Sequence, residues 1–226
     1  MRLDVVRAHF EAEAFDYDGL IPRLIPHYHE QHSLMLELIP FEREASLKVL
    51  DLGAGTGVLS CLILQAFPNA TVVAFDIAEN MIAACKKNLS AYQERVKLHQ
   101  GNFAEDDIGS EYDLVISGLA IHHLDEPEKQ KLYQDLFHAV NPGGLLLIRD
   151  TVTGATPQLT QQYERLWRQY MKANGEDDEK WFQNYLKEDR PSSVEDQLQW
   201  LKSAGFEEVG CHWRYLNFAI FGGRKQ

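Results

Sequence analysis

An apolar run that ends in closely spaced glycines is the feature that most constrains how this chain can fold. Residues 47–52 are mostly apolar, Gly53, Gly55 and Gly57 follow in a G-x-G-x-G pattern, and a helical pattern begins at Val58. Strand, tight turn and helix in this order are typical of α/β nucleotide-binding units. Glycine permits positive φ and has no Cβ, so backbone N–H groups can approach a ligand beside the partially positive helix N-terminus.

An acid at the end of the next predicted strand suggests what the turn binds. Residues 70–75 end at Asp76, about 20 residues beyond the glycines, where dinucleotide folds place the acid that binds ribose. A helix N-cap would use the same residue type. The third glycine of the nicotinamide fingerprint is missing, and Asp51 would repel a pyrophosphate but attract an ammonium group. The pattern therefore predicts a cationic nucleoside cofactor without phosphate.

Strand-like and helix-like segments alternate from Lys48 to Asp150. This alternation predicts a mainly parallel sheet with right-handed crossovers, whose ligands bind beyond the carboxyl ends of the strands. The glycine turn, Asp76, Asn102 and residues 117–119 each follow a predicted strand. We therefore expect all of them along one edge of the sheet.

The motifs of this region resemble those of the class I S-adenosylmethionine (SAM)-dependent methyltransferases. They read D-L-G-A-G-T-G, A-F-D-I-A-E-N-M-I, G-N-F, Y-D-L-V-I-S and N-P-G-G-L-L-L-I, in the order of that family. The resemblance implies an α/β fold with a Rossmann-like seven-stranded sheet, mainly parallel with an antiparallel last strand. It also implies SAM as the cofactor.

The resemblance further implies which residues contact the cofactor. Ile77 and Met81 would flank adenine, Asn102 and Phe103 would bind its edge, and the segment after the fourth strand would border the methyl group. The complete predicted set is Tyr28, Asp51, Gly53, Ala54, Gly55, Asp76, Ile77, Met81, Asn102, Phe103, Gly118 and Leu119.

The substrate pocket is less well defined by the sequence. His122 and His123 follow the fourth strand and could serve as a general base or as capping residues. Methyl transfer to a well-positioned acceptor needs little acid–base help, because proximity and alignment supply the rate. No catalytic residue is assigned. A weaker prediction places three residues in the substrate pocket: Tyr17, His122 and Tyr163.

The rest of the chain is expected to build around this core within a single domain. The predicted parts are a helical leader or lid (1–45), the cofactor-binding core (46–150), a helical insertion (151–192) and a last helix with a hairpin (193–226). Residues 20–26 are expected to be broken by prolines. The leader also carries a histidine cluster, which lacks the further ligands that a metal site needs, so no metal is predicted: His27, His29 and His32.

A looser resemblance runs through most of the chain. Y-D-G-L-I-P-R-L-I-P-H-Y-H-E, L-D-E-P-E-K-Q and A-G-F-E-E-V-G-C-H-W-R-Y-L-N-F are similar to the carboxy-S-adenosylmethionine synthases of tRNA wobble-uridine modification. That family converts SAM with prephenate instead of methylating, and its cofactor-contacting tyrosine matches Tyr28. Its asparagine after the fourth strand falls on Gly118, and its carboxylate-binding arginine falls in 183–186, where this chain has none. Three other arginines could substitute: Arg165, Arg168 and Arg190.

A buried carboxylate without a cation is costly, so this match implies shared architecture more than a shared reaction. The function predicted from the sequence is SAM-dependent methyl transfer, directly and in line, to a small molecule. Two alternatives stay open: a carboxy-S-adenosylmethionine synthase-like enzyme, and a domain that binds SAM without turnover.

The composition of the chain disfavours some classes of binding partner. The net charge of −12 disfavours binding to nucleic acid. No apolar run reaches the roughly 18 residues of a membrane span, and the start of the chain lacks an apolar signal-peptide core. Three cysteines show no metal-binding or C-x-x-C spacing. We therefore expect a cytoplasmic protein with a small-molecule substrate and no membrane partner, and a homodimer is left open.

Overall fold

The computed structural model describes residues 2–13 and 17–226. Its centre is a seven-stranded sheet in the order β3-β2-β1-β4-β5-β7-β6. Strands β1 to β5 pair in parallel, and β7 runs antiparallel to both of its neighbours. The predicted fold class is confirmed. The strands are β1 (Lys48–Leu52), β2 (Thr71–Asp76), β3 (Val96–Gln100), β4 (Tyr112–Gly118), β5 (Val140–Thr151), β6 (Glu207–Tyr215) and β7 (Phe218–Arg224).

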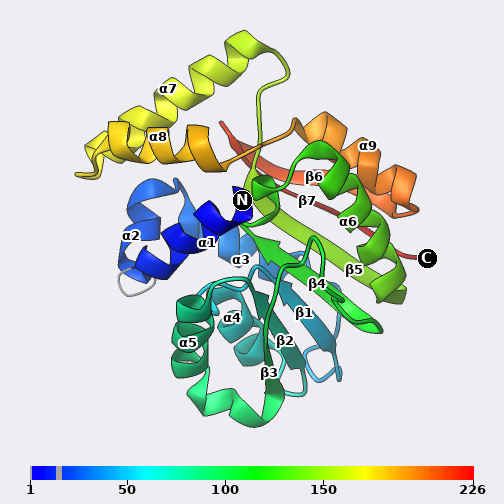
Figure 1. Cartoon of the computed structure of the whole chain (residues 1–226). Coiled ribbons are helices and arrows are strands. Elements are labelled where there is room, and N and C mark those ends of the chain that lie inside the picture. The colour runs from blue at the N-terminus through cyan, green and yellow to red at the C-terminus, as the bar shows by residue number, and fades with distance from the viewer. Residues whose placement is uncertain (1, 14–16) are drawn as a thin grey trace.

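Helices cover both faces of this sheet (Figure 1). One face carries α3 (Tyr28–Glu37), α4 (Val58–Ala66) and α5 (Glu79–Asn88). The other carries α6 (Glu126–Ala139) and α9 (Val194–Ala204). The remaining helical elements are α1 (Arg2–Glu13), α2 (Tyr17–Leu24), α7 (Pro157–Ala173), α8 (Asp178–Glu188) and two short turns, η1 (Ser90–Arg95) and η2 (Ile121–His123).

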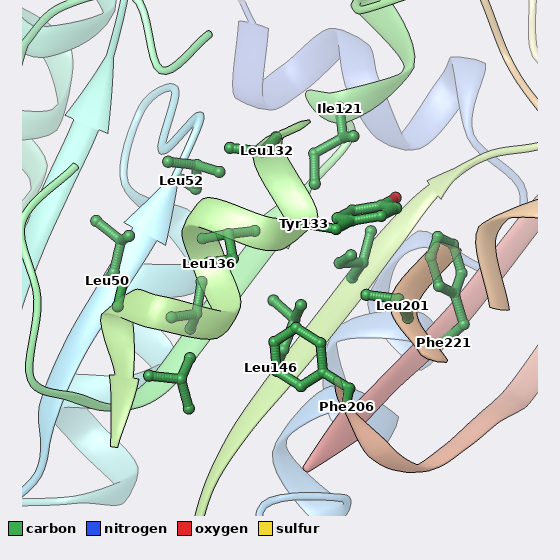
Figure 2. Close-up of a cluster of buried hydrophobic side chains, with 14 of the residues drawn as sticks. Leu50, Leu52, Ile121, Leu132, Tyr133, Leu136, Leu146, Leu201, Phe206 and Phe221 are labelled. Atoms are coloured by element: carbon green, nitrogen blue, oxygen red, sulfur yellow. The ribbon is translucent and has the colours of Figure 1, made fainter. Parts of the chain in front are cut away.

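Apolar side chains alternate between the two faces along each central strand. Leu50 and Leu52 pack beneath α6, whereas Val49 joins the cluster beneath α4. Figure 2 shows the α6 side, where Tyr133 and Leu136 pack toward the sheet and Leu201 comes in from α9. Because both faces are covered, the parallel strands read as nearly continuous apolar runs.

Four helices form a cap outside the two layers (Figure 1). Helices α1 and α2 from the leader pack against α8 and α7 from the insertion. The Trp167 Nε1–H donates to the Leu24 carbonyl (2.8 Å), and the Tyr170 hydroxyl donates to the Pro22 carbonyl (2.9 Å). The aromatic residues of α7 thus join two segments that are far apart in the sequence.

The expectation for residues 20–26 was only partly right, because the helical path breaks at residues 25–27, around Pro26, but not at Pro22. Residues 17–24 form α2, and Pro22 lies inside it. The φ of proline suits a helix, and in so short a helix its missing N–H removes only a bond to the Asp18 carbonyl. In the described part of the chain, no helix is both long and apolar enough to cross a membrane.

Candidate active site

Every residue that the sequence predicts to contact the cofactor lines one cavity, which we call the cofactor cavity. Its empty volume, counted together with the open solvent at its mouth, is about 870 Å³. It lies at the carboxyl ends of the parallel strands, and the leader closes it from outside. The other residues around it include Val6, Phe10, Tyr17, Ile21, His32, Ala120, His123 and Arg149. The individual ligand contacts stay predictions.

The glycine turn is tightly packed at Gly53 and open to the cavity at Gly55. Gly53 has φ 73°, and a Cβ there would lie 2.2 Å from the Ala120 Cβ. Gly55 has φ 53°, yet a Cβ there would meet no atom within 4 Å, because this residue faces the open cavity. The Gly53 N–H is held by the Phe75 carbonyl (2.8 Å). The turn therefore directs the backbone of Gly55 toward the cofactor cavity.

Asp76 is fixed by the backbone around it. One carboxylate oxygen accepts from the Gly55 N–H (2.8 Å) and the other from the Ala78 N–H (2.9 Å). Burial raises the pKa of Asp76, and these two donors oppose the rise. Each oxygen keeps a lone pair that can accept from a ribose hydroxyl. The N-cap residue of α5 is Ala78 and not Asp76, so the helix-cap alternative is wrong, and the ribose-binding role stays a prediction.

Asp51 lies in the middle of the cavity with one oxygen unused. Its Oδ2 accepts from the Ser60 N–H (3.0 Å) and hydroxyl (2.6 Å), whereas the buried Oδ1 has no partner. Burial raises the pKa of Asp51 to about 6, and the bonds from Ser60 oppose the rise. Near neutral pH the carboxylate is ionised and can receive an ammonium group.

Arg149, at the end of β5, is a residue of the cavity that the sequence analysis missed. Its guanidinium lies 5.0 Å from the centroid of the Tyr28 ring, and its Nε and Nη1 are buried without a hydrogen-bond partner. A Cβ on Gly118 would lie 3.4 Å from Arg149 Nη2, so the glycine leaves room for this side chain. The signal was available, since a charge follows the apolar run 145–148 at the carboxyl edge of a strand.

The strand order predicts how a nucleoside amino acid would lie here. Asn102 follows β3 and Asp76 ends β2, whereas Gly118 ends β4 and Arg149 lies in β5. Adenine over β3 and β2 would place the amino-acid end over β4 and β5. Arg149 then faces a carboxylate and Asp51 an ammonium group. His32, beside Arg149, is neutral at pH 7, because burial and then Arg149 lower its pKa to about 3.

A second cavity, the acceptor cavity, shares a wall with the first and has an empty volume of about 710 Å³. The residues that line both cavities are Phe10, Tyr17, Ile21, Leu119 and His123. The residues that line only the second are His9, Leu20, Leu24, Ile25, His122, Thr151, Trp167, Trp181, Asn184, Tyr185, Glu188 and Asp189.

The three residues predicted for the substrate pocket are only partly brought together. Tyr17 and His122 line the acceptor cavity, but Tyr163 lines neither cavity. The Tyr163 ring lies under the Arg214 guanidinium, 5.6 Å from it. Tyr163 and Trp167 are four residues apart and share a face of α7, but Tyr163 lies one turn nearer the start of the helix, where it meets Arg214 of β6.

The histidines of the leader and of η2 have different surroundings. His27 Nδ1 pairs with Glu30 (2.8 Å) at the surface, and His32 lines the cofactor cavity, so these histidines do not converge. His122 Nδ1 is hydrogen-bonded to the buried Asp150 carboxylate. Burial lowers the pKa of His122, but the carboxylates of Asp150 and Asp189 outweigh burial and raise it.

Comparison with known proteins agrees with this geometry. Residues 49–144 match the family model of a methyltransferase domain. The carboxy-S-adenosyl-L-methionine synthase of Nautilia profundicola is 22% identical, and the match covers 93% of this chain and 91% of that protein. The enzyme of the same name from Helicobacter hepaticus is 25% identical, over 96% of this chain and 94% of that protein.

Solved structures show the same fold in longer chains. Human N-acetylserotonin methyltransferase, in complex with SAM, has a TM-score of 0.56 and 23% identity over 79% of this chain and 47% of that one. An O-methyltransferase family 2 protein from Planctomyces limnophilus, in complex with apigenin, has a TM-score of 0.67 and 18% identity over 100% of this chain and 62% of that one. This chain thus spans less than two thirds of either structure. By its fold, its motifs and these matches, the chain resembles the class I SAM-dependent methyltransferases, which supports SAM as its cofactor, and over most of its length it is similar to the carboxy-S-adenosyl-L-methionine synthases.

Proposed function

We propose that the protein transfers the methyl group of SAM to a small molecule held in the acceptor cavity. The observation that carries this proposal is the wall that the two cavities share. Leu119 and His123, which line both cavities, come from the segment after β4, and this segment is expected to border the methyl group. An acceptor in the second cavity would therefore lie next to the methyl donor.

The lining of the acceptor cavity suggests the class of acceptor. Trp167, Trp181 and Tyr185 offer flat apolar surface, and Glu188 and Asp189 lie at the same cavity. Its described lining contains no lysine or arginine. This chemistry suits a neutral or cationic molecule with an apolar or aromatic body. The apigenin bound by the Planctomyces limnophilus protein is an aromatic molecule of comparable kind.

In this reaction the acceptor heteroatom attacks the methyl carbon in line with the breaking carbon–sulfur bond. The electron pair of that bond stays on sulfur, so S-adenosylhomocysteine (SAH) leaves. The protein's contribution is to hold the two reactants in alignment and to exclude water, which can supply most of the rate enhancement.

The test is an acceptor screen that measures SAH release from SAM. An Asn184→Trp variant fills the acceptor cavity from α8 without touching the cofactor cavity. We expect this variant to lose transfer while its affinity for SAH stays at the wild-type value. If the wild type binds SAH but releases none with any acceptor, the proposal is refuted and the protein is a SAM-binding domain.

Carboxy-S-adenosylmethionine synthesis is a second candidate, favoured by the relatives of that name that match over 90% of both chains. Against it stands the acidic lining of the acceptor cavity, which would repel a dicarboxylate such as prephenate. The described residues 183–186 also supply no cation there. Incubation of the protein with SAM and prephenate, followed by mass spectrometry, distinguishes the synthase reaction from methyl transfer. A product heavier than SAM by one carbon dioxide would establish the synthase reaction.

The partners and the compartment belong to the same proposal. We expect neither a nucleic acid nor a membrane as a partner, because of the net charge of −12. A cytoplasmic location is compatible with the free thiols of Cys61, Cys85 and Cys211. Homodimer formation stays open, and sedimentation analysis would decide it.

A further inference from the structure

Two histidines and an aspartate converge at the wall of the acceptor cavity. His122 and His123 come from η2, and Asp189 follows α8. One ligand atom from each of the three lies within 4.8 Å of the others. His122 Nε2 is 3.5 Å from one oxygen of Asp189, and His123 Nδ1 is 3.2 Å from the other. We call these three residues the histidine–aspartate cluster.

The cluster contains ring nitrogens without hydrogen-bond partners. His123 is 7% exposed, and among the described residues its buried Nε2 has no hydrogen-bond partner, while its Nδ1 has only the 3.2 Å contact with Asp189. Buried polar atoms in native proteins are nearly always satisfied. An unsatisfied imidazole beside a second imidazole and a carboxylate therefore indicates a group that binds between them.

The surroundings of His122 match those of a metal ligand. Its Nδ1 is hydrogen-bonded to Asp150, which is fully buried and also accepts from the Thr151 N–H (3.0 Å). An ionised carboxylate can only accept, so Nδ1 carries a proton, and an ion bound between His122 and Asp189 would take the place of any proton on Nε2. A carboxylate that holds the far nitrogen of a histidine is the usual outer support of a metal-bound imidazole.

The local charges also leave room for a cation. Asp150, Asp189 and Glu188 bring three carboxylates to this region. The nearby Lys129 ammonium is bonded to the Arg190 carbonyl and to the Ser192 hydroxyl (2.8 Å). A neutral histidine does not repel a cation. The nearby His9 is hydrogen-bonded to Glu188 (3.1 Å).

We propose that the histidine–aspartate cluster binds a divalent transition-metal ion of the zinc class. Two imidazoles and one carboxylate form a donor set that such ions prefer, and three protein ligands leave a coordination position open. That position faces the acceptor cavity. The inference rests on the proposed function and deepens it, because it makes the acceptor a hydroxyl or thiol compound that coordinates the ion.

The role of the ion would be to make the acceptor a better nucleophile. A metal-bound hydroxyl or thiol loses its proton near neutral pH, and here that proton passes to water. The resulting anion attacks the methyl carbon of SAM. The carbon–sulfur bond then breaks with its electron pair on sulfur, which gives the methylated acceptor and SAH.

The test measures the metal itself. The purified protein is stripped with a chelator, dialysed, and titrated with Zn²⁺ by calorimetry and with Co²⁺ by visible absorption. We expect one equivalent of either ion and a visible Co²⁺ spectrum typical of low coordination number. His123→Ala and Asp189→Asn each disable a direct ligand, so each should weaken binding by at least the roughly 10- to 100-fold that loss of an outer partner of a ligand costs.

A matched control is His27→Ala, which removes a histidine from the exposed pair with Glu30 and should leave metal binding unchanged. Titration of Asp189→Asn with SAH reports whether this variant is folded, because Asp189 lines only the acceptor cavity. It also keeps a failed metal site distinct from a failed cofactor site. Absence of stoichiometric metal in the wild type, or wild-type metal affinity in His123→Ala and Asp189→Asn, overturns the proposal and leaves an ion-pair cluster only.

Discussion

Replacement of Arg149 by methionine should weaken the binding of the cofactor without destabilising the protein. The guanidinium is 4% exposed, and two of its nitrogens have no partner. A hydrogen bond to a charged group contributes about 1.5–3 kcal/mol, and 1.4 kcal/mol is about tenfold in a dissociation constant. The dissociation constant of SAH should therefore rise about 10- to 150-fold in Arg149→Met, by the same conversion.

The stability of the ligand-free protein should respond differently. Among the described residues Arg149 has no close ion pair, although Asp51 and Asp150 interact with it at longer range. Burial of a charge carries a desolvation cost, and an apolar side chain removes that cost. The loss of the contact with the Tyr28 ring offsets part of this gain, by about 0.5–2 kcal/mol. We therefore expect the melting temperature of the ligand-free variant to stay near that of the wild type or to rise.

Calorimetry with two ligands separates carboxylate binding from general damage. Methylthioadenosine has the nucleoside and the sulfur of SAH but no amino-acid end, so its affinity should be the same in Arg149→Met and the wild type. Arg168→Met removes an arginine that pairs with Asp178 and Glu179 on the cap and should change neither affinity. If Arg149→Met weakens the binding of SAH and of methylthioadenosine equally, or changes neither affinity, the role assigned to Arg149 is refuted.

Three further perturbations follow from the same geometry. The affinity for SAH should fall as the pH drops through about 6, because Asp51 becomes protonated and no longer attracts the ammonium group; calorimetry should show a flatter profile for Asp51→Asn. Gly53→Ala should cost about 1–3 kcal/mol of unfolding free energy through overpacking. In Gly55→Ala the new Cβ meets no atom within 4 Å, so the cost should be only about 1–2 kcal/mol from the positive φ, and the main effect should be weaker binding of SAH. Trp167→Ala should destabilise the cap by about 3–5 kcal/mol, and chemical denaturation would show whether that loss is cooperative with the core.

The parts of the fold that could be predicted are those specified by local pattern. The run 47–52 and the glycines after it define a strand and its turn without reference to anything distant, and Asp76 follows at a fixed spacing. Strand–helix alternation then fixes the sheet, because parallel strands require crossovers. Ser193 as a helix N-cap and Gly205 at the other end of α9 (φ 113°) were predictable for the same reason.

The parts that could not be predicted depend on contacts between distant segments. Arg149 on β5 faces Tyr28 on α3, which is far away in the sequence, and nothing in either local sequence links the two. The acceptor cavity lies between the leader and the insertion, which pack against each other through α2 and α7. Tyr163 was misplaced because its end of α7 lies beside Arg214 of β6, a contact between distant segments. The convergence of Asp189 with the histidines of η2 is of the same kind.

The central claim is that the cavity at the carboxyl ends of the strands binds SAM through Asp76. Calorimetric titration of the purified protein with SAH, beside an Asp76→Ala variant, tests it most directly. The account predicts saturable binding of one equivalent to the wild type and its loss in the variant. Absence of binding to the wild type, or equal binding to both proteins, would contradict the account.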